Sequence, residues 1–196
     1  MSNPIKIHSA LAEAMSARSY DTMTPVQEAV LDIEKLDADL LVSAQTGSGK
    51  TLAFGLSIAT TLLQEDTEFS RPKLPVALII APTRELALQV RKELEWVYAR
   101  TNAQFASCVG GMDPRAERRT LESGAHIVVG TPGRLRDHIE RGALRLSDIK
   151  AVVLDEADEM LDMGFREDLT FILEKAPVSR RTLLFSATVP AQIAKM

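Results

Sequence analysis

The stretch Leu40-Leu41-Val42-Ser43-Ala44-Gln45-Thr46-Gly47-Ser48-Gly49-Lys50-Thr51 joins an apolar run to a glycine-rich turn, a lysine and a hydroxyl. Much later in the chain, the apolar run Ala151–Leu154 ends in Asp155-Glu156-Ala157-Asp158. The first stretch has the order of a strand, a turn and a helix, and the second places adjacent carboxylates at the end of a strand. Together they offer the groups that hold a polyphosphate, its metal ion and a water molecule.

The glycine-rich turn is suited to phosphate because its backbone N–H groups can approach closely. Gly47-Ser48-Gly49 carries little bulk, and glycine tolerates a positive φ. Lys50 would reach the β- and γ-phosphates, Thr51 would bind Mg²⁺, and a helix beginning there would point its positive end at the phosphates. The general pattern opens on Gly where this sequence has Ala44, so an ordinary Gly-Ser turn is the alternative. The expected nucleotide-binding residues of this loop are Ala44, Gln45, Thr46, Gly47, Ser48, Gly49, Lys50 and Thr51.

The acidic segment follows a run that is typical of a buried parallel strand. At such a strand end Asp155 can hold Mg²⁺, partly through water, and Glu156 can orient or deprotonate an attacking water. Alternatively, both residues form the acidic first turn of a helix, which the helix dipole favours. A phosphate loop in the same chain favours the catalytic interpretation. Lys50, Asp155 and Glu156 are therefore the candidate catalytic residues.

Composition is that of a soluble globular protein with one well-cored domain. The chain has 196 residues, of which 45% are hydrophobic and 26% are charged. It contains no apolar stretch of ~18 residues, which predicts no membrane span, and its N-terminus lacks the form of a secretory signal. The single Cys108 favours a reducing cytoplasm. The three histidines lie far apart in sequence, so no zinc site is expected.

The net charge of −4 argues against binding to nucleic acid by general electrostatic attraction. Any such contact must use a local basic or main-chain surface. Arginines do cluster locally, although such clusters are more often solvated helix faces. The clustered residues are Arg115, Arg118 and Arg119, and then Arg134, Arg136, Arg141 and Arg145.

Strand-like runs alternate with helix-like segments, which predicts an α/β fold with a mainly parallel sheet and helices on both faces. The predicted strands are 40–43, 76–81, 104–109, 126–130, 151–154 and 182–186. The predicted helices are 51–63, 84–98, 114–122 and 134–141, and Asp113-Pro114 is typical of a helix start. Ligands of such sheets bind beyond the carboxyl ends of the strands, and each distinctive motif here falls at such an end.

Taken together, these motifs resemble those of the N-terminal RecA-like domain of DEAD-box RNA helicases. The resemblance covers nearly the whole sequence in the family's order, and segment 155–165 is similar to that of bacterial members. It implies the RecA-like P-loop NTPase fold, with ATP and Mg²⁺ bound. The matching segments are Thr24–Gln27, Ala44–Thr51, Pro82–Ala87, Gly110-Gly111, Thr131–Arg134, Asp155–Asp158 and Ser186–Thr188.

The resemblance also implies roles for residues outside the phosphate loop. Gln27 would read adenine with its amide, and Tyr20 would stack on the adenine ring. Ser186 and Thr188 would bond near Asp158 and couple the ATP site to the RNA side. The implied RNA-binding residues, whose hydroxyls, guanidinium groups and main chain suit a phosphate backbone, are Pro82, Thr83, Arg84, Gly110, Gly111, Thr131, Gly133 and Arg134.

The adenine-recognition segment departs from the family at three points. Met23 replaces the usual Pro, Ser19 replaces the usual Gly before the aromatic residue, and Ile5 and Ile7 occupy the neighbourhood of an upstream Phe. These differences concern the fine geometry of adenine binding. The alternative role of Tyr20 is core packing, and the alternative role of Ser186 and Thr188 is capping of a strand end.

The expected organisation is a segment of N-terminal helices with the adenine-recognition motif, residues 1–34, followed by RecA-like domain 1, residues 35–196. The family's second RecA-like domain, which supplies an arginine finger worth roughly 10³–10⁵ in rate in related NTPases, is not in this sequence. The isolated domain is therefore expected to hydrolyse ATP very slowly. A DNA-translocating motor and a nucleotide-gated docking module are the alternative functions.

Overall fold

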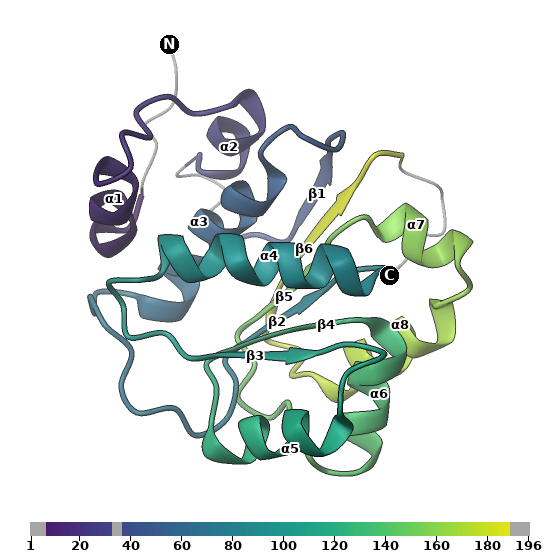
Figure 1. Ribbon diagram of the computed structural model, residues 1–196. Helices are drawn as coiled ribbons and strands as arrows, with labels where there is room; N and C mark the ends of the chain where they lie inside the picture. Colours follow the sequence, from purple (N-terminus) through teal and green to yellow (C-terminus); the bar gives the residue numbers. More distant parts are fainter. Residues whose placement is uncertain (1–6, 33–36, 189–196) are drawn as a thin grey trace.

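Six short apolar segments form one sheet in which all paired strands are parallel. The computed structural model describes residues 7–32 and 37–188, and the strand order is β1-β6-β5-β2-β4-β3 (Figure 1). Every residue of β2, β4 and β5 is buried, which is why these strands are continuous apolar runs. The strands are β1 (Leu40–Ser43), β2 (Ala77–Ile80), β3 (Phe105–Cys108), β4 (Ile127–Gly130), β5 (Ala151–Leu154) and β6 (Arg181–Ser186).

Helices cover both faces of the sheet, as the sequence predicted (Figure 1). One core, which contains Phe54 and Leu94, lies under α1 to α4, and a second core, which contains Leu135 and Met160, lies under α5 to α8. The helices are α1 (Ser9–Ser16), α2 (Pro25–Val30), α3 (Lys50–Leu63), α4 (Arg84–Val97), α5 (Pro114–Ser123), α6 (Pro132–Glu140), α7 (Ala157–Asp162) and α8 (Arg166–Lys175). None of the described helices is long and apolar enough to cross a membrane.

The N-terminal helices share a core with the rest of the fold. Leu11, Val30 and Leu31 are buried in the same cluster as α3 and α4. The expected boundary between residues 34 and 35 lies outside the described residues, as does Ile5. The predicted strands and four predicted inner helices are present, with ends that differ by up to two residues.

Helices α7 and α8 were not among the predicted helices, although the alternative interpretation of Asp155 and Glu156 placed a helix start next to α7. The first is only six residues long, too short to show a helical period. The second does carry a periodic apolar face, since Leu169, Ile172 and Leu173 recur at spacings of three and one and are buried. That signal was available in the sequence.

Candidate active site at the carboxyl edge of the sheet

The glycine-rich loop wraps tightly between β1 and α3. Gly47 and Gly49 have φ of 81° and 84°, and Ser48 Oγ donates to the carbonyl of Gln45 at 2.7 Å. Both glycines therefore occupy the left-handed region that their lack of a Cβ permits. Helix α3 begins at Lys50 with no capping side chain and no acidic residue in its first turn. Its first N–H groups and its dipole are thus available to an anion.

The lysine of this loop faces the acidic pair. Lys50 Nζ lies 3.5 Å from Asp155 Oδ1 and 3.4 Å from Glu156 Oε1. Thr46 Oγ1 donates to the same Glu156 oxygen at 3.3 Å. Strand β6 separates β1 from β5 in the sheet, yet the side chains meet beyond its end. The glycine-rich loop and the carboxylate pair are therefore within reach of one small ligand.

Asp155 supplies an oxygen that suits a metal ion. The residue is 1% exposed, and Oδ1 makes no hydrogen bond within the described part of the chain. Burial, together with the negative charge of Glu156, raises the pKa of Asp155 to about 6, although Lys50 opposes this rise. A divalent cation would stabilise this buried carboxylate, so the donor set fits Mg²⁺.

Three further observations define the surroundings of the acidic pair. Glu156 stands in a left-handed conformation with φ of 53° immediately before α7, which turns its side chain toward Thr46 and Lys50. Burial raises the pKa of Glu93 on α4, and a hydrogen bond with Thr51 opposes that rise. Sequence reasoning missed Glu93, which contacts the candidate metal ligand. A cavity of about 200 Å³ opens beside these groups, lined by Thr46, Lys50, Glu156, Asp158, Glu159, Asp162 and Ala187.

The segment that we expect to recognise adenine contacts the glycine-rich loop directly. Gln27 is fully buried, and its Oε1 accepts from the backbone of Thr24 at 3.0 Å, which completes a capping box for α2. Its Nε2 donates to Tyr20 Oη at 3.0 Å and to the carbonyl of Gly49 at 3.2 Å. Ser19, where the family usually has Gly, adopts a left-handed φ of 54°. The Gln27 amide must therefore exchange a protein contact before it can bind a base.

The proposed coupling residues do contact one another. Asp158 Oδ2 accepts from both the backbone N–H and the hydroxyl of Thr188 at 2.9 Å, and the Asp158 N–H donates to Ser186 Oγ at 3.2 Å. Burial raises the pKa of Asp158, but the hydrogen bonds from Thr188 and Ser186 outweigh it and hold that pKa below its usual value. The end of β6 is thus attached to the acidic segment.

Comparison with known proteins places this chain in a family. The family model described as DEAD/DEAH box helicase matches residues 24–196. The chain belongs to the DEAD/DEAH box helicase family. The chain is 42% identical over 191 residues to the DEAD-box ATP-dependent RNA helicase CshA of Bacillus licheniformis, which covers 97% of this chain and 38% of that protein. It is 45% identical over 188 residues to the DEAD-box ATP-dependent RNA helicase 53 of Oryza sativa subsp. japonica, covering 95% of this chain and 30% of that protein.

A solved structure shows the same fold. The crystal structure of a DEAD box protein from the hyperthermophile Methanococcus jannaschii superposes with a TM-score of 0.87 at 36% identity. The match covers 97% of this chain and 51% of that chain. The chain thus spans between 30% and 38% of the two curated helicases named above and half of this solved chain.

In this DEAD/DEAH box domain, three loops expected to contact RNA lie at the carboxyl edges of β2, β3 and β4. Gly111 has a φ of 77°, and a Cβ there would lie 2.8 Å from Nη1 of Arg84, so these two loops touch. Thr83 caps α4 by accepting from the Leu86 N–H at 3.2 Å. Thr131 stands at the cap position of α6, but its side chain makes no capping hydrogen bond.

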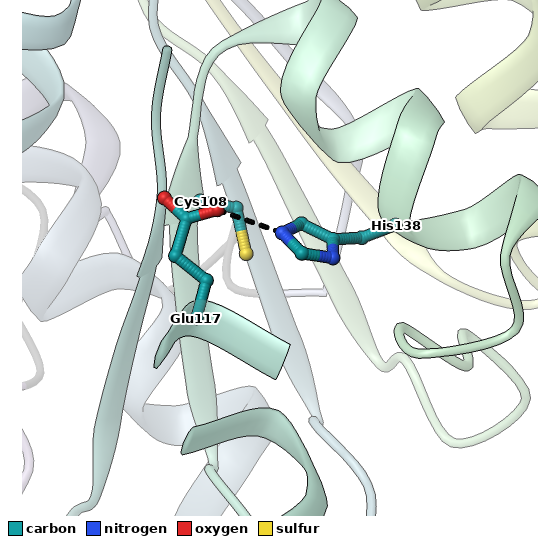
Figure 2. A group of neighbouring side chains, drawn as sticks. All are labelled: Cys108, Glu117 and His138. Carbon is teal, nitrogen blue, oxygen red and sulfur yellow. Dashed lines mark hydrogen bonds and ion pairs between the residues drawn. The ribbon is translucent and has the colours of Figure 1, made fainter. Parts of the chain in front are cut away.

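One cluster beneath these loops was not anticipated. Cys108 on β3, Glu117 on α5 and His138 on α6 are buried, and their ligand-type atoms lie within 4.8 Å of one another. Figure 2 shows the Glu117 carboxylate directed at the His138 ring, with the Cys108 sulfur beside it. Glu117 occupies the apolar face of α5, four residues before the buried Leu121. A charged residue on an apolar face was the only signal in the sequence.

Proposed function

We propose that this chain is the ATP-binding half of an ATP-dependent RNA helicase. The contact of Lys50 with both Asp155 and Glu156 supports the proposal, because it brings the lysine that follows the glycine-rich loop and two carboxylates to one site. Hydrolysis of ATP in the longer protein would be coupled to local opening of an RNA duplex. Cys108, a buried free thiol, supports a reducing cytoplasmic location.

The residues of the site would divide the work of phosphoryl transfer. The loop N–H groups and Lys50 would hold the phosphates, and Glu156 would accept a proton from the attacking water. Asp155 and the Thr51 hydroxyl would hold Mg²⁺, which when bound neutralises charge on the phosphates. Gln27 would exchange its Tyr20 contact for the adenine edge, and Tyr20 would then be free to stack on the base.

The rim formed by the loops after β2, β3 and β4 would bind the RNA backbone. Hydroxyl, guanidinium and main-chain N–H groups make contacts with phosphates and sugars that carry no sequence information. Binding should therefore be independent of sequence, with RNA preferred through its 2′-hydroxyl. The net charge of −4 makes this local surface, and not the whole domain, responsible.

Turnover would require the second RecA-like domain that we propose for the longer protein. The relatives are more than twice as long as this chain, which leaves room for such a domain. Closure of two domains on ATP and RNA would complete the site with an arginine and separate a short duplex. The N-terminal segment 1–34 and the RecA-like domain 35–196 would together form the first motor half of that protein.

The proposed function is tested by comparing ATP hydrolysis of the longer protein in the presence of RNA and of DNA of equal length. Stimulation by RNA alone supports the helicase proposal, and equal stimulation by DNA favours a DNA motor. Failure of this 196-residue chain to bind adenine nucleotides would refute the proposal. A biological role that survives Glu156→Gln unaltered would favour a docking module.

A further inference from the structure

Glu117 joins two of the loops at the proposed RNA rim through a single buried carboxylate. Its Oε1 accepts from the backbone N–H of Val109 at 2.8 Å. Its Oε2 accepts from Nη1 of Arg134 at 3.2 Å and lies 2.7 Å from Nε2 of His138 (Figure 2). Only 6% of the Glu117 side chain is exposed, so these interactions are weakly screened by water.

The partners of Glu117 belong to both loops. Val109 directly precedes Gly110-Gly111, and Arg134 is the last residue of the Thr131–Arg134 motif. Arg134 also donates to the carbonyl of Met112, just past the glycines, at 3.4 Å. The described contacts of Arg134 all use Nη1, which leaves Nε and Nη2 to approach a phosphate.

The same cluster has the residue types of a metal site, but its contacts oppose one. Both carboxylate oxygens of Glu117 already accept hydrogen bonds, and the Arg134 cation would repel a second cation beside it. Burial raises the pKa of the Cys108 thiol, and Glu117 adds to that rise although Arg134 opposes it. A protonated thiol is a poor metal ligand. The contacts of Glu117 instead hold the Arg134 guanidinium in place.

We propose that Glu117 is a positioning residue that fixes the Arg134 guanidinium and the Gly110-Gly111 loop in the arrangement that binds an RNA backbone. This inference rests on the proposed function, since it assigns a support to that same RNA rim. A guanidinium held by one edge loses less conformational freedom when its other edge binds a phosphate. Without Glu117, the Arg134 side chain would lose its conformational freedom only when RNA binds, which would weaken the binding.

Helix α5 offers a matched control. Glu122 lies on the same helix, is exposed, and forms an i,i+4 ion pair with Arg118. Glu117→Gln and Glu122→Gln remove the same negative charge from the same helix. Loss of that charge increases the general attraction for RNA equally in both variants, so a difference in their RNA affinities has another cause. Glutamine at 117 also keeps a carbonyl oxygen that can accept from the Val109 N–H.

The test measures binding of a short fluorescent single-stranded oligoribonucleotide to the 196-residue chain by anisotropy, with saturating Mg²⁺ and a non-hydrolysable ATP analogue. Glu117→Gln should weaken RNA binding about five- to tenfold relative to Glu122→Gln, the scale of a lost charge-assisted contact. Nucleotide affinity should be unchanged between the two. In the Arg134→Ala background, Glu117→Gln should add less than about a twofold effect, because its partner is already gone.

Equal RNA affinities of the two single variants, or an undiminished Glu117→Gln effect in the Arg134→Ala background, would overturn the inference. If Glu117→Gln does not fold, the wild-type chain still decides, because an Arg134 held through Nη1 should give resolved, slowly exchanging Nη1–H signals by NMR. A signal averaged with those of exposed arginines would contradict the inference. A wild-type chain without RNA affinity would instead refute the proposed function, and this inference with it.

Discussion

Lys50 Nζ and Asp155 Oδ1 lie 3.5 Å apart, although they follow strands that do not pair with each other. Both side chains are almost fully buried, so the ion pair partly offsets the cost of burying either charge. Under the proposed function, a nucleotide phosphate would replace the carboxylate as the partner of Lys50, and a metal ion would replace the ammonium as the partner of Asp155. Each member of the Lys50–Asp155 ion pair would thus keep an oppositely charged partner when the nucleotide and its metal ion bind.

Replacement of Lys50 by alanine should weaken binding of Mg²⁺-ADP by about tenfold or more, because a charge-assisted contact to phosphate is lost. It should also lower the free energy of unfolding, since Asp155 would remain buried without its cation. Calorimetric titration and urea unfolding measure the two effects. Lys92→Ala, at an exposed position of α4, is the charge-matched control and should change neither.

Replacement of Glu156 by glutamine should abolish most hydrolysis while nucleotide binding persists. The amide can still accept from Thr46 Oγ1 but cannot take a proton from water, and loss of a general base typically costs about 10²-fold or more. RNA-stimulated phosphate release by the longer protein is the measurement. Glu174→Gln, on the exposed side of α8, should retain wild-type turnover. Comparable rates for both variants would remove Glu156 from the proposed mechanism.

Replacement of Gly49 by alanine should disturb nucleotide binding more than its backbone strain alone would. A Cβ there would lie 2.6 Å from Nε2 of Gln27, and the φ of 84° adds a cost of about 1–2 kcal/mol. Gly142, with φ of 70° and nothing within 4 Å of its Cβ, isolates the backbone cost. Both variants should lose stability in urea unfolding, but only Gly49→Ala should lose preference for ADP over GDP.

The lowered pKa of His126 should reduce the free energy of unfolding in mild acid. Burial lowers the pKa of His126 from the usual 6.5, and the hydrogen bond between its ring and Ser70 partly opposes this shift. The His126 Nδ1 accepts from the Gln104 N–H at 2.9 Å, and the ring stacks on Phe69. A lowered folded pKa means that the unfolded chain binds the proton more readily. The contribution of His126 is therefore present above pH 6.5 and is lost as pH falls through the folded pKa.

The measurement is the urea-unfolding free energy at pH values from about 8 to about 5, with the ring titration followed by NMR. His126→Asn should be less stable than wild type at the upper end but should lack this part of the pH dependence. If the two proteins lose stability in parallel, or the ring titrates at or above 6.5, the assignment is wrong.

The sheet and its binding edge could be predicted because they depend on local patterns. Continuous apolar runs such as Ala151–Leu154 identified buried parallel strands, and parallel strands bring their carboxyl ends to one edge. The family resemblance identified the motifs on that edge. The order of the strands, by contrast, depends on packing between distant segments, and no local pattern showed that β6 lies between β1 and β5.

The partners of the site residues could not be predicted for the same reason. The Gln27 amide bonds to Tyr20 and Gly49, and no pattern in the sequence indicated these two partners. Glu93 and Glu117 are ordinary helical glutamates in sequence. Their roles emerge only where α4 meets Thr51 and where α5 meets α6.

The left-handed backbone of Glu156 places stability and turnover in opposition at one position. A residue with a Cβ held at φ of 53° carries a cost of about 1–3 kcal/mol that glycine would not incur. Laboratory selection for heat resistance alone should therefore favour Glu156→Gly. That variant should unfold at a higher temperature and should no longer hydrolyse ATP. Wherever selection keeps glutamate here, the chain is being held below the thermal tolerance that its own fold could reach.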